Sequence, residues 1–140
     1  MALSASRSTP RRGHPLPVLI NAPIKASTQV YKGGLACVDS TGYFVPGAIS
    51  TTLIAMGVFM EDALGTGSSG AVRTNVETGI FKFLNSSSGD LIAQSEVGKS
   101  CYIVDDQTVA KTSNTNTRSI AGTVIEIDPD GGVWVKVGPV

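Results

Sequence analysis

One stretch of the sequence has the residue types of a nucleotide-binding loop. Residues 93–100 (AQSEVGKS) match a loose form of the phosphate-binding loop, in which backbone N–H groups surround the phosphates and a helix begins at the Lys-Ser pair. Ala93 replaces the first glycine of that pattern, and the residues after Ser100 read Cys-Tyr-Ile-Val, which is typical of a strand. We therefore predict a Gly98-Lys99 turn that enters a strand, and no binding or hydrolysis of ATP.

Two pairs of acidic residues could hold a cation or exchange a proton. Asp128 and Asp130 begin like a calcium loop, but glycine stands at the fourth position instead of the sixth and Pro139 at the twelfth instead of glutamate. Asp105 and Asp106 are adjacent, so their carboxylates would point in different directions. Both pairs are predicted to form turns between strands.

The remaining residues that could do chemistry are few. His14 is the only histidine, and a Ser-His-Asp or Cys-His site would need its segment to fold back onto the rest of the chain. Cys37 and Cys101 are the only cysteines, and without a CxxC pair a structural zinc site is excluded. We predict two free, buried thiols. The sequence therefore predicts no enzyme, with no catalytic residue, no cofactor and no metal.

The composition indicates which elements would position these residues. Isoleucine and valine together far outnumber leucine, threonine and serine are frequent, and the chain holds 16 Gly and 7 Pro. Such residues fit pleated sheets and tight turns. We predict an all-β fold, a compact small barrel or sandwich of short antiparallel strands. The longest apolar run, residues 53–60, is too short to span a membrane.

Strand-like segments separated by turn residues recur along the body of the chain. The apolar run 53–60 is predicted to be the most central strand, and residues 71–77 alternate in the manner of a strand with one solvated face. Residues 94–97 are predicted to form at most one helical turn. The expected strands are residues 29–32, 35–39, 43–45, 53–60, 71–77, 80–84, 101–104, 108–111, 120–127 and 133–137.

Residues 1–24 are expected to form an extended, basic, proline-containing N-terminal arm, separate from a body of residues 25–140. The arm contains Arg7, Arg11, Arg12 and several prolines, and the first acidic residue of the chain is Asp39. A polar segment of this kind cannot build its own core, and ordering each residue costs about 1–2 kcal/mol of backbone entropy. We therefore expect the arm to lie on a neighbouring copy or on another protein. A transit peptide is the alternative.

Particular residues of the arm and body are expected to contact that partner. Arg7, Arg11 and Arg12 are predicted to face its carboxylates. The proline-free run 18–22, with Val18, Leu19 and Ile20, is predicted to pair with the edge of a sheet. Trp134 lies opposite a face of three valines, so we predict that it faces a partner, with a second core on its side as the alternative.

The charge of the chain gives an alternative function. The formal net charge is zero, but the arm is basic and could contact nucleic-acid phosphates. Binding of single strands favours aromatic residues in a basic groove, and few aromatics are grouped here. Nucleic acid is therefore an unlikely partner, and no membrane association is expected.

Several stretches resemble one known family. They are residues 31–39 (YKGGLACVD), 56–62 (MGVFMED), 79–83 (GIFKF), 97–110 (VGKSCYIVDDQTVA) and 121–127 (AGTVIEI). Together they resemble the small capsid decoration, or cement, proteins of tailed bacteriophages, some of which carry a recombinase label. The resemblance covers most of residues 22–137, and the first 20 residues fall outside it. It implies a compact β domain, a homotrimer, that binds the outside of a capsid near its local three-fold positions.

The sequence thus predicts a structural virion protein that cements neighbouring major capsid subunits and stabilises the head. Its expected location is the capsid surface of the virion, after synthesis in the cytoplasm of the bacterial host. The alternative function is a nucleic-acid-binding β-barrel module that uses the basic arm. A small trimeric enzyme is a third class, and it would require a deep pocket with perturbed carboxylates between subunits.

Overall fold

Short antiparallel strands make up most of the structure, a computed structural model that describes residues 1–12 and 18–139. The only helical segments in those residues are two 3-10 turns, η1 (Ser88–Asp90) and η2 (Gln94–Glu96). The all-β prediction is therefore confirmed. The strands are β1 (Arg11–Arg12), β2 (Leu19–Pro23), β3 (Gln29–Val30), β4 (Leu35–Val38), β5 (Phe44–Pro46), β6 (Ile54–Phe59), β7 (Ala63–Leu64), β8 (Arg73–Glu77), β9 (Gly79–Phe83), β10 (Ser100–Ile103), β11 (Val109–Ala110), β12 (Ile120–Ile127) and β13 (Val133–Val137).

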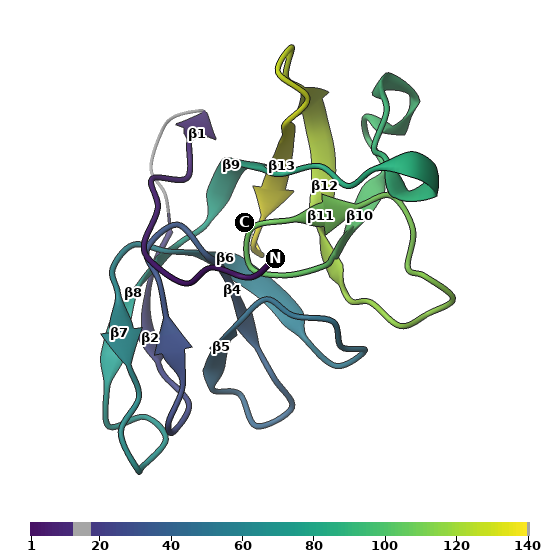
Figure 1. Cartoon of the computed structure of the whole chain (residues 1–140). Helices are drawn as coiled ribbons and strands as arrows, with labels where there is room; N and C mark the ends of the chain where they lie inside the picture. Colours follow the sequence, from purple (N-terminus) through teal and green to yellow (C-terminus); the bar gives the residue numbers. More distant parts are fainter. Residues whose placement is uncertain (13–17, 140) are drawn as a thin grey trace.

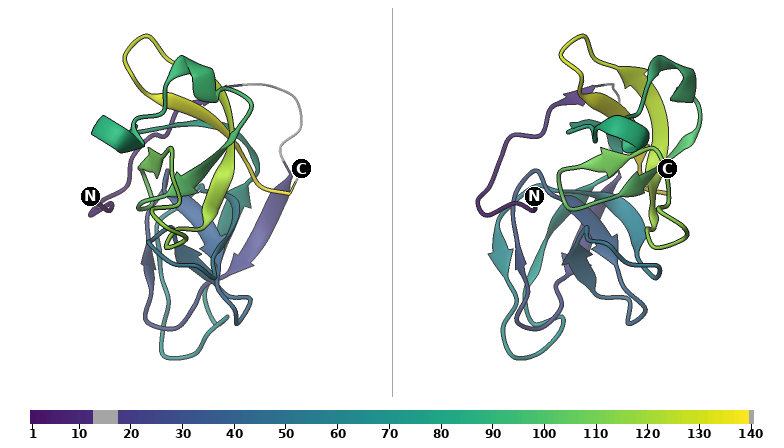
Figure 2. Two further views of the ribbon diagram at one scale, coloured as in Figure 1. Left: turned by 90° about the vertical axis from the view of Figure 1, so that its right-hand side faces the viewer. Right: turned by 45° about the vertical axis from the view of Figure 1, so that its right-hand side comes forward.

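Two larger sheets form the two halves of the molecule (Figures 1 and 2). The first has six strands in the order β1-β9-β13-β12-β10-β11, and the second has five in the order β2-β8-β6-β4-β5. β8 belongs to the second sheet and β9 to the first, so the chain crosses between the sheets at Thr78. A small sheet of β3 and β7 lies beside the second sheet. The arrangement is consistent with the predicted sandwich.

Most of the hydrophobic core is shared by the two larger sheets. Phe81, Phe83 and Val135 from the first sheet pack in one buried cluster with Leu35 and Val58 from the second. A second cluster lies on the other face of the five-stranded sheet and contains Ala22, Ile24, Ala36, Phe44, Phe59 and Val76. Because this sheet is buried on both faces, its strands β4 and β6 are nearly continuous apolar runs. β6 occupies the centre of the sheet, as predicted from residues 53–60.

The turns that were predicted from sequence are also present. β4 pairs with β5, β10 with β11 and β12 with β13, each as an antiparallel hairpin. Residues 93–100 form η2 and then enter β10, so the nucleotide-loop pattern is a turn before a strand, as predicted. Asp128 to Gly132 closes the β12–β13 hairpin through the hydrogen bonds Asp128 N–H to Gly132 O (2.8 Å) and Gly131 N–H to Asp128 O (2.9 Å).

The structure divides the N-terminal region differently from the expected boundary at residue 24. β2 pairs along its length with β8, and Ala22 and Ile24 are fully buried in the second cluster. Residues 18–24 are therefore part of the body, because their alternate side chains complete its core. Residues 1–12, which we call the strap, run over the surface of the body (Figure 1). His14 and the rest of 13–17 lie outside the described residues.

No helix within the described residues is long and apolar enough to cross a membrane.

Candidate interaction surfaces

The strap is held by hydrogen bonds along its whole length. The Leu3 N–H donates to Asp106 Oδ1 (2.7 Å), and the Arg7 N–H donates to the Lys32 carbonyl (2.8 Å). Further along, the Lys82 N–H donates to the Pro10 carbonyl (2.8 Å), and β1 then pairs with β9. The surface that receives the strap, which we call the seat, consists of Lys32, Gly33, Gly34, the turn Asp105-Asp106-Gln107 and the edge of β9. The seat lies entirely on the body.

Two glycines allow the strap to approach the body closely. Gly33 has a φ of +87°, and a Cβ atom there would lie 2.7 Å from Arg7 Cγ and would also overlap the Arg7 carbonyl. A Cβ atom at Gly34 would lie 3.2 Å from Leu3 Cδ1 and 3.3 Å from Asp106 Oδ2. The pair therefore has a packing reason, because any side chain at Gly33 would displace the strap.

The acidic turn of the seat is buried. Asp105 and Asp106 are 7% and 3% exposed, and their carboxylates contact the first residues of the strap. Burial raises the pKa of Asp106, and the charge of Asp105 adds to this effect. Burial also acts on Asp105, but contacts from the Met1 ammonium and the Gln107 N–H outweigh it and lower the pKa of Asp105. The pKa of Asp105 is therefore lowered while that of Asp106 is raised. Both carboxylates hold the strap in place.

The arginines of the strap contact their own chain. Arg7 Nη1 donates to Gln107 Oε1 (3.3 Å). Arg11 forms an ion pair with Glu77 and lies over the ring of Phe81, 5.7 Å from its centroid. Arg11 thus faces a carboxylate, but one of its own body. The backbone of Arg12 pairs with Ile80, and its side chain lies outside what the structure describes.

Val18, Leu19 and Ile20 differ in what they contact. Leu19 is 63% exposed and Val18 is partly exposed, whereas Ile20 packs against the second cluster. The predicted pairing with a sheet edge is made within the chain, to β8. This leaves Val18 and Leu19 as apolar surface beside the strap's connection to the body.

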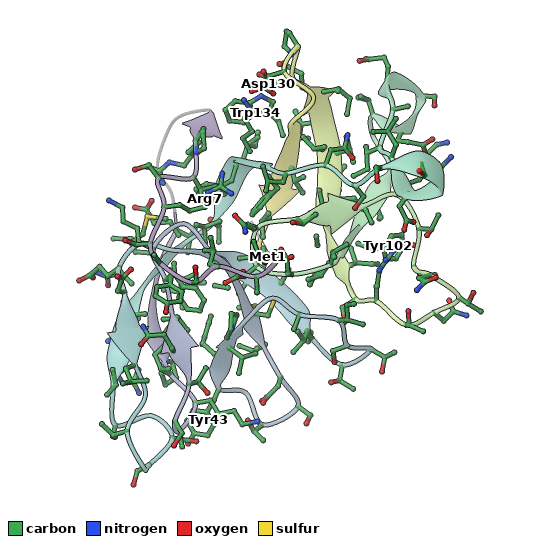
Figure 3. All side chains as sticks on the ribbon, viewed as in Figure 1. Met1, Arg7, Tyr43, Tyr102, Asp130 and Trp134 are labelled. Atoms are coloured by element: carbon green, nitrogen blue, oxygen red, sulfur yellow. The ribbon has the colours of Figure 1, made fainter. Side chains whose placement is uncertain are left out.

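Trp134 does not present its ring to a partner in the single chain. Its side chain is 7% exposed, and its indole Nε1–H donates to Asp128 Oδ1 (3.1 Å). This hydrogen bond, with others from the same turn, lowers the pKa of Asp128 to about 2. Figure 3 shows Trp134 beside Asp130 at the end of the β12–β13 hairpin. The partner-facing prediction needs correction, because the chain itself covers Trp134, although Lys136 on the same face of β13 is exposed.

A second concave surface lies on another part of the body and is open. It is a groove of about 860 Å³ between the start of β6, the strands β10 and β12, and the loop of residues 113–119. Ile54 and Ile120 are 62% and 53% exposed beside it. Figure 3 shows Tyr102, one of its lining residues, well away from Arg7 and Met1 of the strap. The other lining residues are Thr51, Leu53, Ala55, Ser113, Asn116, Arg118, Ser119, Ala121, Gly122, Thr123, Lys136 and Gly138.

The charged side chains that line the groove are cationic. Its lining contains Arg118 and Lys136 and no carboxylate among the described residues. Arg118 is largely buried and bonds through Nη1 to Asp90 Oδ2 (3.2 Å) and to the Thr112 carbonyl (3.1 Å). Its Nε is buried without a hydrogen-bond partner among the described residues. Lys136 is exposed.

The loop at one side of the groove has an unusual backbone. Asn114, Thr115 and Asn116 have φ values of +50°, +60° and +62°, so three successive residues with side chains are left-handed. Asparagine tolerates this conformation, whereas it costs roughly 1–2 kcal/mol at Thr115. The loop is kept in place by the Thr117 N–H, which donates to the Ser113 carbonyl (2.9 Å), and by Thr112 Oγ1, which donates to Asp90 Oδ1 (2.5 Å). Strain of this kind is concentrated at functional sites, which makes the loop a candidate for recognition.

The described residues contain no group of three or more His, Cys, Asp and Glu side chains that could hold a metal ion. Cys37 and Cys101 are free and buried, as predicted, and burial raises the pKa of each thiol to about 12. Both thiols therefore stay protonated at neutral pH, and a nucleophilic role is disfavoured.

The sequence predicted an extended N-terminal segment but placed it on a partner, whereas residues 1–12 lie on the body of their own chain. It predicted neither the seat nor the groove. Gly33-Gly34 and Asp105-Asp106 were visible as local turn signals, and their convergence at one seat depends on long-range contacts. Comparisons with family models, with curated proteins and with solved structures found no match to this chain. The resemblance to phage decoration proteins stays a prediction.

Proposed function

We propose that this chain is a structural protein that binds the outside of a tailed-phage capsid and cements neighbouring major capsid subunits. In this proposal it acts as a homotrimer on the surface of the virion, after synthesis in the cytoplasm of the bacterial host. The proposal combines the sequence resemblance with one structural observation, the open groove beside Ile54 and Ile120.

The groove supports a protein partner better than a small substrate. Sites for small molecules bury most of their ligand's surface. Here two large apolar side chains are more than half exposed at the groove, an arrangement that suits a large surface laid across it. The loop 113–119 adds a wall whose backbone is held by hydrogen bonds from Thr117 to Ser113 and Asn114, and a wall ordered before binding loses less entropy on binding.

The lining also indicates the chemistry of the occupant. Hydroxyl groups and two cations surround the apolar residues, without a carboxylate among the described lining residues. A capsid segment that fits would be extended, apolar at its centre and acidic at one end, so that its carboxylate lies near Lys136. Charge complementarity of this kind contributes specificity and register more than affinity.

A modest interface is enough for cementing. A protein that binds the assembled shell, and not free capsid subunits, stabilises the shell by about 2.7 kcal/mol per site at a hundred times its dissociation constant. Trimers gain further, because after one subunit has docked the next binds at an effective concentration in the millimolar range. Many weak sites therefore strengthen one shell.

The contacts of the strap count against the nucleic-acid alternative. Arg11 is paired with Glu77 and lies over Phe81, and Arg7 bonds to Gln107. These side chains would have to leave their partners to reach phosphates. A salt titration with DNA tests that alternative, since phosphate binding weakens steeply as salt rises.

The test of cementing uses the phage that encodes the chain. Its heads are purified from a deletion mutant that lacks the gene for this protein. Purified protein is added to saturation, and release of packaged DNA is followed with a fluorescent dye during heating. We expect the release temperature to rise with occupancy until the sites are full. Equal release temperatures with and without saturating protein would contradict cementing.

A further inference from the structure

We propose that the guanidinium of Arg118 binds a carboxylate of the protein that covers the groove, so that an aspartate or glutamate of that partner lies against the loop 113–119. This inference rests on the groove as the interaction surface of the proposed function, and it names the chemical group that one wall of the groove recognises. The acid at Arg118 is additional to the one expected near Lys136. Lys136 is opposite Thr123 of β12, whereas Arg118 precedes that strand, so the two cations have separate places in the lining.

One end of the Arg118 guanidinium is fixed within the chain. Its Nη1 donates to Asp90 Oδ2 (3.2 Å) and to the Thr112 carbonyl (3.1 Å). The other oxygen of Asp90 accepts a hydrogen bond from Thr112 Oγ1 (2.5 Å), so both oxygens of this carboxylate are engaged. These bonds hold the planar group in one orientation, and its remaining donors therefore have a fixed direction.

The other side of the guanidinium has donors without acceptors. Nε is buried without a hydrogen-bond partner, and Nη2 forms no hydrogen bond among the described residues. Nε is the only described atom that is both buried and unpaired, so Nη2 retains exposed surface, where an acceptor can enter. The Nε–H and one N–H of Nη2 are parallel in a guanidinium and match the two oxygens of a carboxylate. We call this pair of donors the fork.

The fork gains more from an acceptor than an exposed arginine would. The side chain of Arg118 is 10% exposed, and a buried donor without a partner carries an unrecovered cost of desolvation. A carboxylate at the fork removes that cost through charge-assisted hydrogen bonds. The contact is therefore favourable although Asp90 already neutralises the charge of Arg118.

The surroundings of the fork favour a carboxylate that belongs to a protein. The described lining of the groove contains no carboxylate, so none there competes for Arg118. Ile54 and Ile120 are more than half exposed at the same groove, and apolar residues beside the partner's acid would cover them. A nucleic acid would find a single aromatic side chain in the described lining, Tyr102, on which to stack its bases. A protein segment therefore satisfies both the fork and the apolar side chains.

The fork is ordered before the partner arrives. The backbone N–H of Arg118 donates to the Ser113 carbonyl (3.1 Å), as does the N–H of Thr117 (2.9 Å), so the loop holds the base of the side chain. Nη1 holds its tip. Binding therefore costs little side-chain entropy at Arg118, whereas the exposed side chain of Lys136 has to be ordered by the contact. Arg118 is accordingly the residue that fixes the position of the partner's acid.

Nuclear magnetic resonance of the free, full chain tests the fork directly, because the Nε–H group of each arginine gives its own signal. The Arg118 signal is identified by its absence from Arg118→Lys, a variant that keeps a cation beside Asp90 and lacks the fork. The probe is N-acetylglutamate N-methylamide, which presents a glutamate side chain, and N-acetylglutamine N-methylamide is its neutral match. We expect only the glutamate probe to move the Arg118 signal, downfield and to saturation. Arg73, which is exposed and does not line the groove, should show no saturable shift.

A third probe, dimethyl phosphate, represents the backbone of a nucleic acid. The proposal is overturned if the glutamate probe leaves the Arg118 signal in place, or if the glutamine probe moves it equally. It is also overturned if dimethyl phosphate binds more tightly than the glutamate probe, because the fork would then recognise phosphate.

Sedimentation with heads that lack the endogenous protein is the second measurement. Arg118→Lys, shown to be folded by circular dichroism, should lose about tenfold in affinity, since hydrogen bonds to a charged group are lost. Arg73→Lys is the matched control and should bind as wild type does, because Arg73 donates to the Asn21 carbonyl (3.1 Å) away from the groove. Wild-type affinity of Arg118→Lys would overturn the proposal and leave cementing intact. If the wild-type protein itself does not bind heads, the proposed function fails, and the resonance experiment still decides whether the fork takes a carboxylate.

Discussion

The seat and the groove of this protein differ in what covers them. The seat is filled by residues 1–12 of the chain, which form backbone hydrogen bonds with it and help to line a cavity that Phe59 and Phe81 also line. The groove beside Ile54 and Ile120 is larger, and no described segment lies in it. The chain therefore covers one surface that its folding requires and leaves another free for an interaction.

The polar groups differ in the same way. The seat contains buried carboxylates that are bonded by the strap, whereas the groove contains hydroxyl groups and cations. Buried carboxylates need their donors permanently, because loss of a partner leaves a desolvated charge. The described lining of the groove contains no carboxylate that requires a donor.

The largest expected effect is a difference in the free energy of unfolding between a variant beneath the strap and a variant at the groove. Phe81→Ala removes a fully buried ring beneath the strap and should lower the free energy of unfolding by about 3–5 kcal/mol. Ile120→Ala removes a side chain that is 53% exposed and should cost less than about 1 kcal/mol. Urea denaturation of both variants measures the difference. Equal losses would show that the groove is part of the structural core.

A pair of glycines tests whether the seat is specific for the strap. Gly33 and Gly42 have φ values of +87° and +83°, but a Cβ atom meets the strap only at Gly33 and meets nothing within 4 Å at Gly42. Each glycine-to-alanine substitution should cost about 1–2 kcal/mol for the backbone. Gly33→Ala should cost more and should also release the strap.

Limited trypsin digestion reads out that release, since the strap contains Arg7 and Arg11. Cleavage there should accelerate in Gly33→Ala and stay at the wild-type rate in Gly42→Ala. The same rate in both variants would mean that the strap does not depend on close approach at Gly33.

A smaller effect depends on pH. Burial raises the pKa of Asp106, so at this group the folded protein binds more protons than the unfolded chain. The charged carboxylate therefore lowers the free energy of unfolding progressively as pH rises above 3.8, the ordinary pKa of an aspartate. Asp106→Asn keeps an oxygen for the Leu3 N–H and removes the charge. The variant should be more stable than wild type at pH 7, and this difference should close at pH 3.5. A constant difference in denaturation midpoint across pH would contradict a desolvated carboxylate.

The smallest effect concerns the ion pair of the strap. Arg11→Met removes a contact with Glu77 and with the Phe81 ring and should cost less than about 1 kcal/mol. Lys25→Met breaks the pair with Asp39 (2.5 Å) elsewhere on the surface and serves as the control. Arg11→Met removes the trypsin site at residue 11, so release is read as cleavage after Arg7, which only this variant should increase. Similar digestion of both variants would show that this pair does not hold it.

The sequence allowed prediction of the features that depend on local patterns. Alternation in β8 and the Asp-Pro-Asp-Gly-Gly turn after β12 placed strands and hairpins correctly, because side-chain period and turn chemistry act over a few residues. The run 53–60 also identified the central strand, since a sheet buried on both faces needs continuous apolar residues.

Features that depend on distant contacts could not be predicted in this way. Ile24 looked like the end of a free arm, but its burial arises from packing against residues far along the chain. Trp134 looked like a partner contact because only one face of its strand is rich in valine, yet its own side chain is buried by the chain and bonds to Asp128. The groove combines β6, β10, β12 and the loop 113–119, and no single stretch of sequence contains it.

Binding to heads by variants of the groove tests most directly the claim that this open surface receives the capsid. The variant Ile54→Glu with Ile120→Glu places carboxylates at the groove, and Leu64→Glu changes a residue of similar exposure, 59%, that does not line it. All proteins are sedimented with purified heads that lack the endogenous protein, after circular dichroism has shown that they are folded. We expect the groove variant to lose at least tenfold in affinity, about 1.4 kcal/mol, and Leu64→Glu to bind as wild type does. Wild-type affinity of the folded groove variant would contradict the assignment of this surface to the capsid.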